Sequence, residues 1–207
     1  PVAKWIKTKN REIFSSSEDV KVAAMFDFLD GNIINDSPNK NQAYTAGKYL
    51  GLLANIGKDF KTKQQRSRNI FSEFERVLNN SNYFINNIDG GEKFVGQVKE
   101  KINFGKKSKQ LSGFIHNDYR PSNMFFKNDK EITGIIDFDW SCIGPLIKDL
   151  ALAIVEWSFP DGKQEPDMEL FNVFLGGYNS MALYKRRKDK ELYSWIKFAT
   201  LSDASTY

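Results

Sequence analysis

Two stretches decide the fold of this 207-residue chain: Phe114-Ile-His-Asn-Asp-Tyr-Arg-Pro-Ser-Asn123 and Gly134-Ile-Ile-Asp-Phe-Asp-Trp140. The first contains the pattern His-x-Asp-x-x-x-x-Asn, and the second places Asp137 at the end of an apolar run, fourteen positions after Asn123. In phosphoryl transfer, one Asp orients and deprotonates the acceptor hydroxyl, while an Asn and a second Asp hold magnesium against the nucleotide phosphates. The ordered pair of stretches therefore predicts a phosphoryl-transfer site.

The two stretches assign a role to each polar residue. Asp118 is the predicted catalytic base; the competing interpretation is a turn-capping Asp, and we favour catalysis because Asn123 and Asp137 follow in order. Asn123 and Asp137 are the predicted metal ligands, since magnesium prefers hard oxygen ligands and takes few protein groups besides phosphates. Asp139 competes for the metal role. We assign the metal to Asp137, which directly follows the apolar run, and leave Asp139 an indirect or acceptor-binding role.

Four further residues surround this pattern. His116, the only histidine, is expected to brace the loop by hydrogen bonds rather than to act as a base. Arg120 is a candidate catalytic residue that touches the transferring phosphoryl group, and the alternative of a surface arginine stays open. Asp149 lies in an apolar segment, needs a partner there, and is expected to brace the catalytic loop. Cys142, the only cysteine, is interpreted as a buried or incidental thiol.

Hydrophobic periodicity predicts the elements around the site. A short hairpin is expected around Lys9–Arg11, and an apolar strand over 22–29 stops at Asp30-Gly31. Helices are expected near 40–56, 70–78, 92–104, 144–158, 166–182 and 188–204. Two apolar segments, at 124–126 and 132–136, predict a β-hairpin that brings Asp118 and Asn123 to the same edge as Asp137.

The composition excludes several classes of protein. The formal charge is +4, and basic clusters occur at 61–68, 106–109 and 185–190. We interpret these clusters as solvated surface rather than a nucleic-acid or membrane site, because no aromatic-interleaved basic stripe accompanies them. No apolar run approaches the length of a membrane span. With one cysteine and no signal peptide, we expect a cytoplasmic protein with neither nucleic-acid nor membrane partners.

The residues resemble the aminoglycoside phosphotransferase and choline kinase family, the small-molecule branch of the protein-kinase-like fold. The family's loop, His-Gly-Asp-Leu-x-x-x-Asn, is matched by His116, Asp118 and Asn123, and its Ile-Asp-Phe/Trp-Asp/Glu strand by Ile136–Asp139. A Gly-Pro and an Asp-Leu-Ala follow in both, here ending at Ala151. Protein kinases themselves fit less well, because Asp137-Phe138 is followed by Asp rather than Gly.

The resemblance implies an α+β fold, with a mostly helical C-lobe, an embedded catalytic β-hairpin and a remnant of the N-lobe sheet. Residues 1–31 would form the end of the N-lobe and the hinge strand, and 32–207 the helical C-lobe. Within the C-lobe lie the catalytic loop, 114–123, and the metal-binding segment, 134–140. The hinge resemblance implies that Asp27 and Leu29 contact the adenine through their main chains.

The implied activity is ATP- and Mg-dependent phosphorylation of a hydroxyl on a small molecule. Candidate acceptors are an aminoglycoside, choline, homoserine or a sugar-like alcohol, in a pocket expected to be shaped by residues from Trp157 to Tyr178. Several nearby acidic residues could serve a cationic acceptor or form a solvated rim, namely Glu156, Asp161, Glu165, Asp167 and Glu169. The oligomeric state and the choice between ATP and GTP are left open.

One departure from the family motivates an alternative. No phosphate-covering loop, nucleotide-binding lysine or partner helix can be placed before Val22, so we expect a partial copy of the fold. The second hypothesis is therefore a catalytically inactive pseudokinase or nucleotide-binding module.

Overall fold

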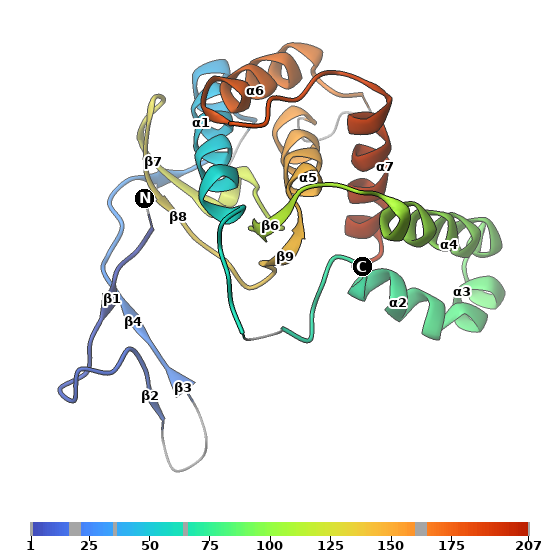
Figure 1. The fold of residues 1–207 in the computed structure, drawn as a ribbon, viewed down its shortest axis with the longest axis horizontal. Helices are drawn as coiled ribbons and strands as arrows, with labels where there is room; N and C mark the ends of the chain where they lie inside the picture. Colours follow the sequence, from blue (N-terminus) through green and yellow to red (C-terminus); the bar gives the residue numbers. More distant parts are fainter. Residues whose placement is uncertain (1, 17–21, 35–36, 64–65, 160–164, 207) are drawn as a thin grey trace.

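A computed structural model of the chain describes residues 2–16, 22–34, 37–63, 66–159 and 165–206. Its main part is a helical body, from which a narrow two-stranded ribbon projects (Figure 1). The helices are α1 (Lys40–Gly57), α2 (Ser72–Asn79), α3 (Ser81–Asn87), α4 (Gly91–Lys107), α5 (Leu146–Ser158), α6 (Met168–Met181) and α7 (Lys190–Ala204). The predicted helices are therefore present, and α3 is an addition that the sequence pattern did not predict. No helix in the described ranges is long and apolar enough to cross a membrane.

Helices α1 and α6 lie against each other at very short range (Figure 1). A Cβ at Gly47 would collide with the Phe174 carbonyl, and one at Gly177 with the Tyr44 carbonyl. The small residues thus let the two backbones approach more closely than ordinary side chains allow. This packing fixes α1 beside α5 and α6, and the core fills with large side chains, among them Trp157, Phe174 and Trp195, all of which are buried.

The predicted β-hairpin is confirmed and belongs to a three-stranded sheet. Strand β7 (Met124–Asn128) pairs antiparallel with β8 (Glu131–Ile135), and β5 (Asn32–Ile33) pairs with the other side of β7. Gly31 enters β5 at a φ of 124°, where a Cβ would lie 2.7 Å from the Phe126 carbonyl oxygen. The predicted Asp30-Gly31 turn thus connects the ribbon to β5, the strand that pairs with the hairpin.

A second small sheet was not predicted. Strand β6 (Ser112–Ile115) pairs with β9 (Cys142–Pro145), so Ile115 lies opposite Cys142. Because residues 144 and 145 belong to β9, the following helix begins at Leu146 rather than at the predicted residue 144. It also brings the residues that follow β6 next to those that precede β9, and these are the two stretches singled out in the sequence.

The hairpin expected around Lys9–Arg11 is present only as a tight turn. The Arg11 amide donates to the Thr8 carbonyl and the Thr8 amide donates to the Glu12 carbonyl, each at 2.9 Å, but the strands that flank the turn do not pair with each other. Instead β1 (Trp5–Ile6) pairs with β4 (Met25–Phe26). Between them β2 (Ser15–Ser16) pairs with β3 (Val22–Ala23), so the expected strand over 22–29 is broken into two pieces. Turn residues alone could not reveal these longer-range pairings, which are set by chain partners further away.

Candidate active site

The catalytic loop runs from the end of β6 to η1 (Pro121–Asn123), a single 3₁₀ turn that leads into β7. Asp149, on α5, accepts hydrogen bonds from the backbone amides of His116 at 2.9 Å and Asn117 at 2.7 Å. Burial raises the pKa of the Asp149 carboxyl, although His116 and the two amides act in the opposite direction. The expectation that Asp149 braces the loop is confirmed, because its two oxygens satisfy two buried amides.

His116 joins the loop to the metal-binding segment. Its Nε2 lies 2.9 Å from the Ile136 carbonyl oxygen, which can only accept, so Nε2 carries the proton. The buried Nδ1 has no hydrogen-bond partner within the described ranges. The ring also packs on Phe138, with centroids 4.5 Å apart. His116 therefore braces the loop, as predicted.

Two further contacts hold the loop against the core, and no local sequence pattern predicts them. The Tyr119 hydroxyl donates to the Ala46 carbonyl of α1 at 2.9 Å, and the Trp157 indole donates to the Tyr119 carbonyl at 3.1 Å. Both aromatic side chains are fully buried. Each of these two side chains combines apolar burial with one hydrogen bond, so together they hold the loop in a fixed position on the core.

Asn117 adopts a left-handed backbone conformation, with a φ of 65°. Asn tolerates this region because its short polar side chain can bond locally. Here its Nδ2 donates to the Trp140 carbonyl at 3.0 Å, and its Oδ1 accepts from the Lys148 ammonium. This residue stands where the family pattern has Gly, and its side chain ties the catalytic loop to both the metal-binding segment and α5.

Asp118, the predicted base, is half-buried and holds both of its oxygens in hydrogen bonds. Oδ1 accepts from Arg120 Nε at 2.6 Å, and Oδ2 accepts from Asn123 Nδ2 at 2.9 Å. Each carboxylate oxygen offers about two lone-pair directions, so an acceptor hydroxyl can still donate to this group. The loop therefore fixes the orientation of the carboxylate before any substrate arrives.

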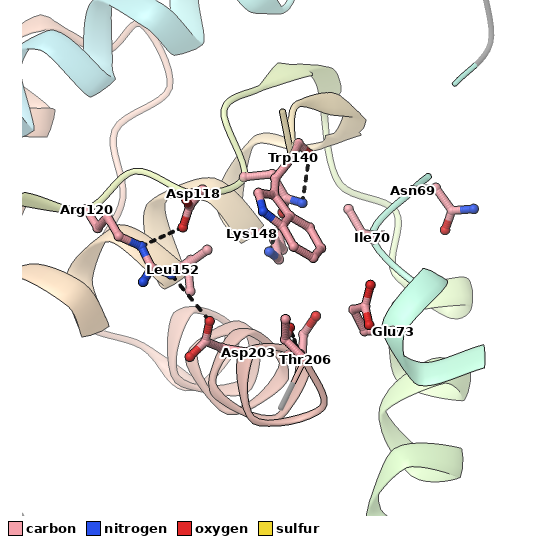
Figure 2. A pocket seen from close by; sticks show the side chains of 12 residues that line it. Asn69, Ile70, Glu73, Asp118, Arg120, Trp140, Lys148, Leu152, Asp203 and Thr206 are labelled. Atoms are coloured by element: carbon pink, nitrogen blue, oxygen red, sulfur yellow. Dashed lines mark hydrogen bonds and ion pairs between the residues drawn. The ribbon is translucent and has the colours of Figure 1, made fainter. Parts of the chain in front are cut away.

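Arg120 lies half-buried among three carboxylates. Besides Asp118, it pairs with Glu156 at 3.7 Å. It also pairs with Asp203 at 3.5 Å (Figure 2). Desolvation raises the pKa of the Glu156 carboxyl, and Arg120 lowers it. The guanidinium thus links the catalytic loop to α5 and α7, and its contact with the transferring phosphoryl group stays a prediction.

The two predicted metal ligands lie on adjacent segments. Asn123 is buried, Asp137 is exposed at the end of β8, and the Ile136 amide donates to the Asn123 carbonyl at 3.0 Å. Asn123 turns its Nδ2 toward Asp118, which leaves its Oδ1 available, and the Asp139 amide lies 3.4 Å from Asp137 Oδ1. No cluster of three or more His, Cys, Asp or Glu that could hold a metal occurs in the described part of the chain. The donor set, one amide and one carboxylate oxygen, fits magnesium that is also bound by phosphates.

The predicted adenine contacts lie at the base of the ribbon. The Asp27 amide already donates to the Lys4 carbonyl at 2.9 Å, so of its main-chain groups only the carbonyl oxygen is left to contact a ligand. The Leu29 side chain packs on Gly134, where a Cβ would collide with it. Leu29 therefore lies over the end of β8, next to the metal-binding segment, and both nucleotide contacts stay predictions.

A cavity of about 150 Å³ lies beside Asp118 (Figure 2). Its walls come from the catalytic loop, the start of α2 with the segment before it, Trp140, α5 and the end of α7. The lining residues are Asn69, Ile70, Glu73, Asn117, Asp118, Arg120, Trp140, Lys148, Leu152, Ser202, Asp203 and Thr206.

The sequence predicts an acceptor pocket shaped by residues from Trp157 to Tyr178, but this cavity has a different lining. Trp157 and Tyr178 are buried in the core, and none of the described residues of that segment, 157–159 and 165–178, lines the cavity. Glu169 pairs with Lys40 on the surface, and Asp161 lies outside the described residues. The α7 wall was missed because it carries no local motif and reaches the site only by packing against α5.

Known protein families and curated proteins are similar to this chain in sequence. A model described as "Phosphotransferase enzyme family" matches residues 10–184. Curated relatives include a homoserine kinase of Nitrobacter hamburgensis, 27% identical over 84% of this chain and 52% of the relative. Another is a homoserine kinase of Rhodopseudomonas palustris, 31% identical over 75% of this chain and 47% of the relative. The chain thus spans about half the length of the curated relatives it matches.

Solved structures share the fold. An amicoumacin kinase in complex with AMP-PNP, Ca²⁺ and its ligand matches all of this chain and 63% of its own, with a TM-score of 0.77 and 17% identity. A spectinomycin phosphotransferase in complex with ADP and spectinomycin matches all of this chain and 66% of its own, with a TM-score of 0.62 and 15% identity. The predicted α+β, kinase-like fold is therefore confirmed.

Proposed function

Because the chain belongs to the phosphotransferase enzyme family, we propose that its site transfers the γ-phosphoryl group of ATP, with magnesium, to a hydroxyl of a small molecule. The observation that carries this proposal is the placement of Asp118, which is fixed by Arg120 and Asn123 at the wall of a cavity. A carboxylate so placed can accept a proton from a hydroxyl bound in the cavity as the new P–O bond forms.

The other site residues would bind the metal, the transferring phosphoryl group and the adenine. Asn123 Oδ1 and the Asp137 carboxylate would hold magnesium, which when bound neutralises phosphate charge. Arg120 would touch the transferring phosphoryl group while it keeps Asp118 in orientation. Asp27 and Leu29 would receive the adenine through their main chains. The acceptor is one of the small alcohols that the family uses, such as an aminoglycoside, choline, homoserine or a sugar-like compound, and the protein is proposed to act in the cytoplasm.

A second candidate function is nucleotide binding without transfer. It is favoured by the same network, because both Asp118 oxygens already accept hydrogen bonds from the protein. An acceptor hydroxyl must add to these bonds or displace one of them. If neither happens, the site binds MgATP and the chain is a pseudokinase.

Calorimetry of MgATP binding tests the proposal, with Asp137→Asn, a magnesium-free sample and Asp139→Asn as the matched control. We expect magnesium-dependent binding that Asp137→Asn weakens at least about tenfold, a loss like that seen when metal-site residues are changed. Asp139→Asn should bind nearly as the wild type does. Equal loss in both variants, or binding without magnesium, would contradict the assignment of Asp137.

Product formation separates the two candidate functions. Transfer from ATP to an acceptor panel should fall about 10²–10⁴-fold in Asp118→Asn, the usual contribution of a general base. MgATP binding should be retained in that variant. Binding without any product, in the wild type with every acceptor, would support the pseudokinase instead.

A further inference from the structure

Lys148 is a buried cation that the proposed chemistry does not use. It lies on α5, is 3% exposed, and lines the cavity beside Asp118 (Figure 2). Burial lowers the pKa of its ammonium, and the neighbouring acids, first Asp149, oppose that shift. A buried ammonium is costly unless it is paired. None of the ion pairs among the described residues includes Lys148; its hydrogen-bond partner is the neutral Asn117 amide oxygen.

The carboxylates of the cavity and the neighbouring Asp149 are, by contrast, already bound by arginines or by backbone amides. Glu73 pairs with Arg76 at 3.0 Å, and Asp118 and Asp203 both pair with Arg120. Asp149 turns its two oxygens to the backbone of the catalytic loop. Lys148 differs from these arginines: Asp149, Asp203 and Asp118 lie near enough to favour its charged form, yet among the described residues it forms no ion pair with any of them. Its ammonium can therefore donate to an anionic group in the cavity.

Asn117 holds the lysine in position. Its Oδ1 occupies one of the three ammonium donors, and its Nδ2 is fixed on the Trp140 carbonyl. The remaining donors are available to a group in the cavity. The Lys148 side chain lies between Asp118 and Trp140 in the same wall (Figure 2).

The size of the cavity supports a small ligand. Its volume of about 150 Å³ is below the roughly 300 Å³ at which pockets for drug-sized ligands begin. We infer that Lys148 is a specificity-determining residue, which binds a carboxylate of the acceptor and so selects small hydroxy acids over polycationic or neutral alcohols. This inference rests on the proposed function, since it names the acceptor class of the same site.

The test compares a hydroxy acid with an isostere in which a neutral amide replaces the carboxylate. L-Homoserine and L-homoserinamide have the same shape and differ in the carboxylate, and 4-hydroxybutyrate keeps the carboxylate without the amine. We would titrate each into the wild-type chain by calorimetry, with and without saturating MgATP. The expected result is that both acids bind at least tenfold more tightly than the amide.

Two variants assign this preference to Lys148. Lys148→Met keeps the length of the side chain and removes its charge, so it should bind L-homoserine and the amide equally. Lys130→Met, on the exposed hairpin turn, is the matched control and should keep the full preference. Circular dichroism establishes that each variant is folded.

The outcomes separate the two proposals. If wild type binds acid and amide equally, or binds neither while it binds MgATP, the acceptor inference is overturned and the phosphotransferase proposal stands. A preference that persists in Lys148→Met also overturns it. If the acids bind with the expected preference but MgATP does not bind, the pocket assignment holds and the phosphotransferase proposal fails. These results can be read without any turnover, and the wild-type comparison needs no variant.

Discussion

The helical body and the N-terminal ribbon differ in how far their large apolar side chains are buried. In the body, Phe174 and Trp195 are fully buried between helices. In the ribbon, residues of the same kind lie on the surface, and Phe28 is 93% exposed. Trp5 and Phe26 contact each other across β1 and β4, with ring centroids 4.3 Å apart, yet both remain exposed to about half. Two-stranded ribbons of this size bury too little surface to be stable alone.

The two regions therefore hold their parts of the proposed site with different firmness. The proposed base and metal ligands lie on the body, where Asp149, Tyr119 and Trp157 fix the loop through buried hydrogen bonds. The proposed adenine contacts stand on the ribbon, which is held mainly by its own short strands and by β5. We therefore expect substitutions in the body to change global stability and those in the ribbon to leave it nearly unchanged.

The largest expected effect comes from a matched pair of phenylalanines. Phe174→Ala should lower the free energy of unfolding by about 3–5 kcal/mol, because it removes a buried ring and leaves a cavity. Phe28→Ala should change it by less than about 0.5 kcal/mol, as is usual for exposed positions. Urea unfolding monitored by circular dichroism measures both. A large loss in Phe28→Ala would mean that the ribbon is part of the cooperative core.

A matched pair of carboxylates gives a smaller effect. Asp149→Asn keeps the shape but replaces one acceptor oxygen by a donor, so one buried amide of the loop loses its partner. The expected cost is about 1–3 kcal/mol. Asp27→Asn, on the exposed ribbon, should cost almost nothing in the same denaturation experiment. Equal costs would show that the loop is not braced by Asp149.

The smallest expected effect depends on pH. Burial raises the pKa of the Cys142 thiol to about 11, whereas an unfolded thiol ionises near about 8.5. Below that lower pKa the contribution of the neutral thiol to stability is fully present. As the pH rises toward 11, the unfolded chain loses its proton first, so the free energy of unfolding falls.

Between pH 8 and 10, we expect the free energy of unfolding of wild type to fall by up to about 2 kcal/mol more than that of Cys142→Ala. Urea titrations at the two pH values measure this difference, and all other titrating groups are common to both proteins. A cysteine placed on the ribbon by Phe28→Cys, in the Cys142→Ala background, should add no such dependence because it stays exposed. Identical slopes for wild type and Cys142→Ala would contradict the burial argument.

The sequence predicted the catalytic hairpin and the helices well, because both depend on short-range patterns. Asp118 and Asn123 precede one strand of a hairpin and Asp137 follows the other, so local pairing alone brings them to one edge. The ribbon was predicted poorly. Its strands are two residues long, and their partners lie up to about twenty residues away, beyond what a turn signal can specify.

The chain by itself determined the family, the fold class and the identities of the proposed base and metal ligands. The tertiary structure decided what surrounds them: the pairing of β6 with β9, the approach of Asp203 to Arg120, and the placement of Lys148 on Asn117. The reason is physical. A motif encodes groups that a hairpin or helix brings together locally, whereas the walls of the cavity come from helices whose relative positions are fixed only when the core packs.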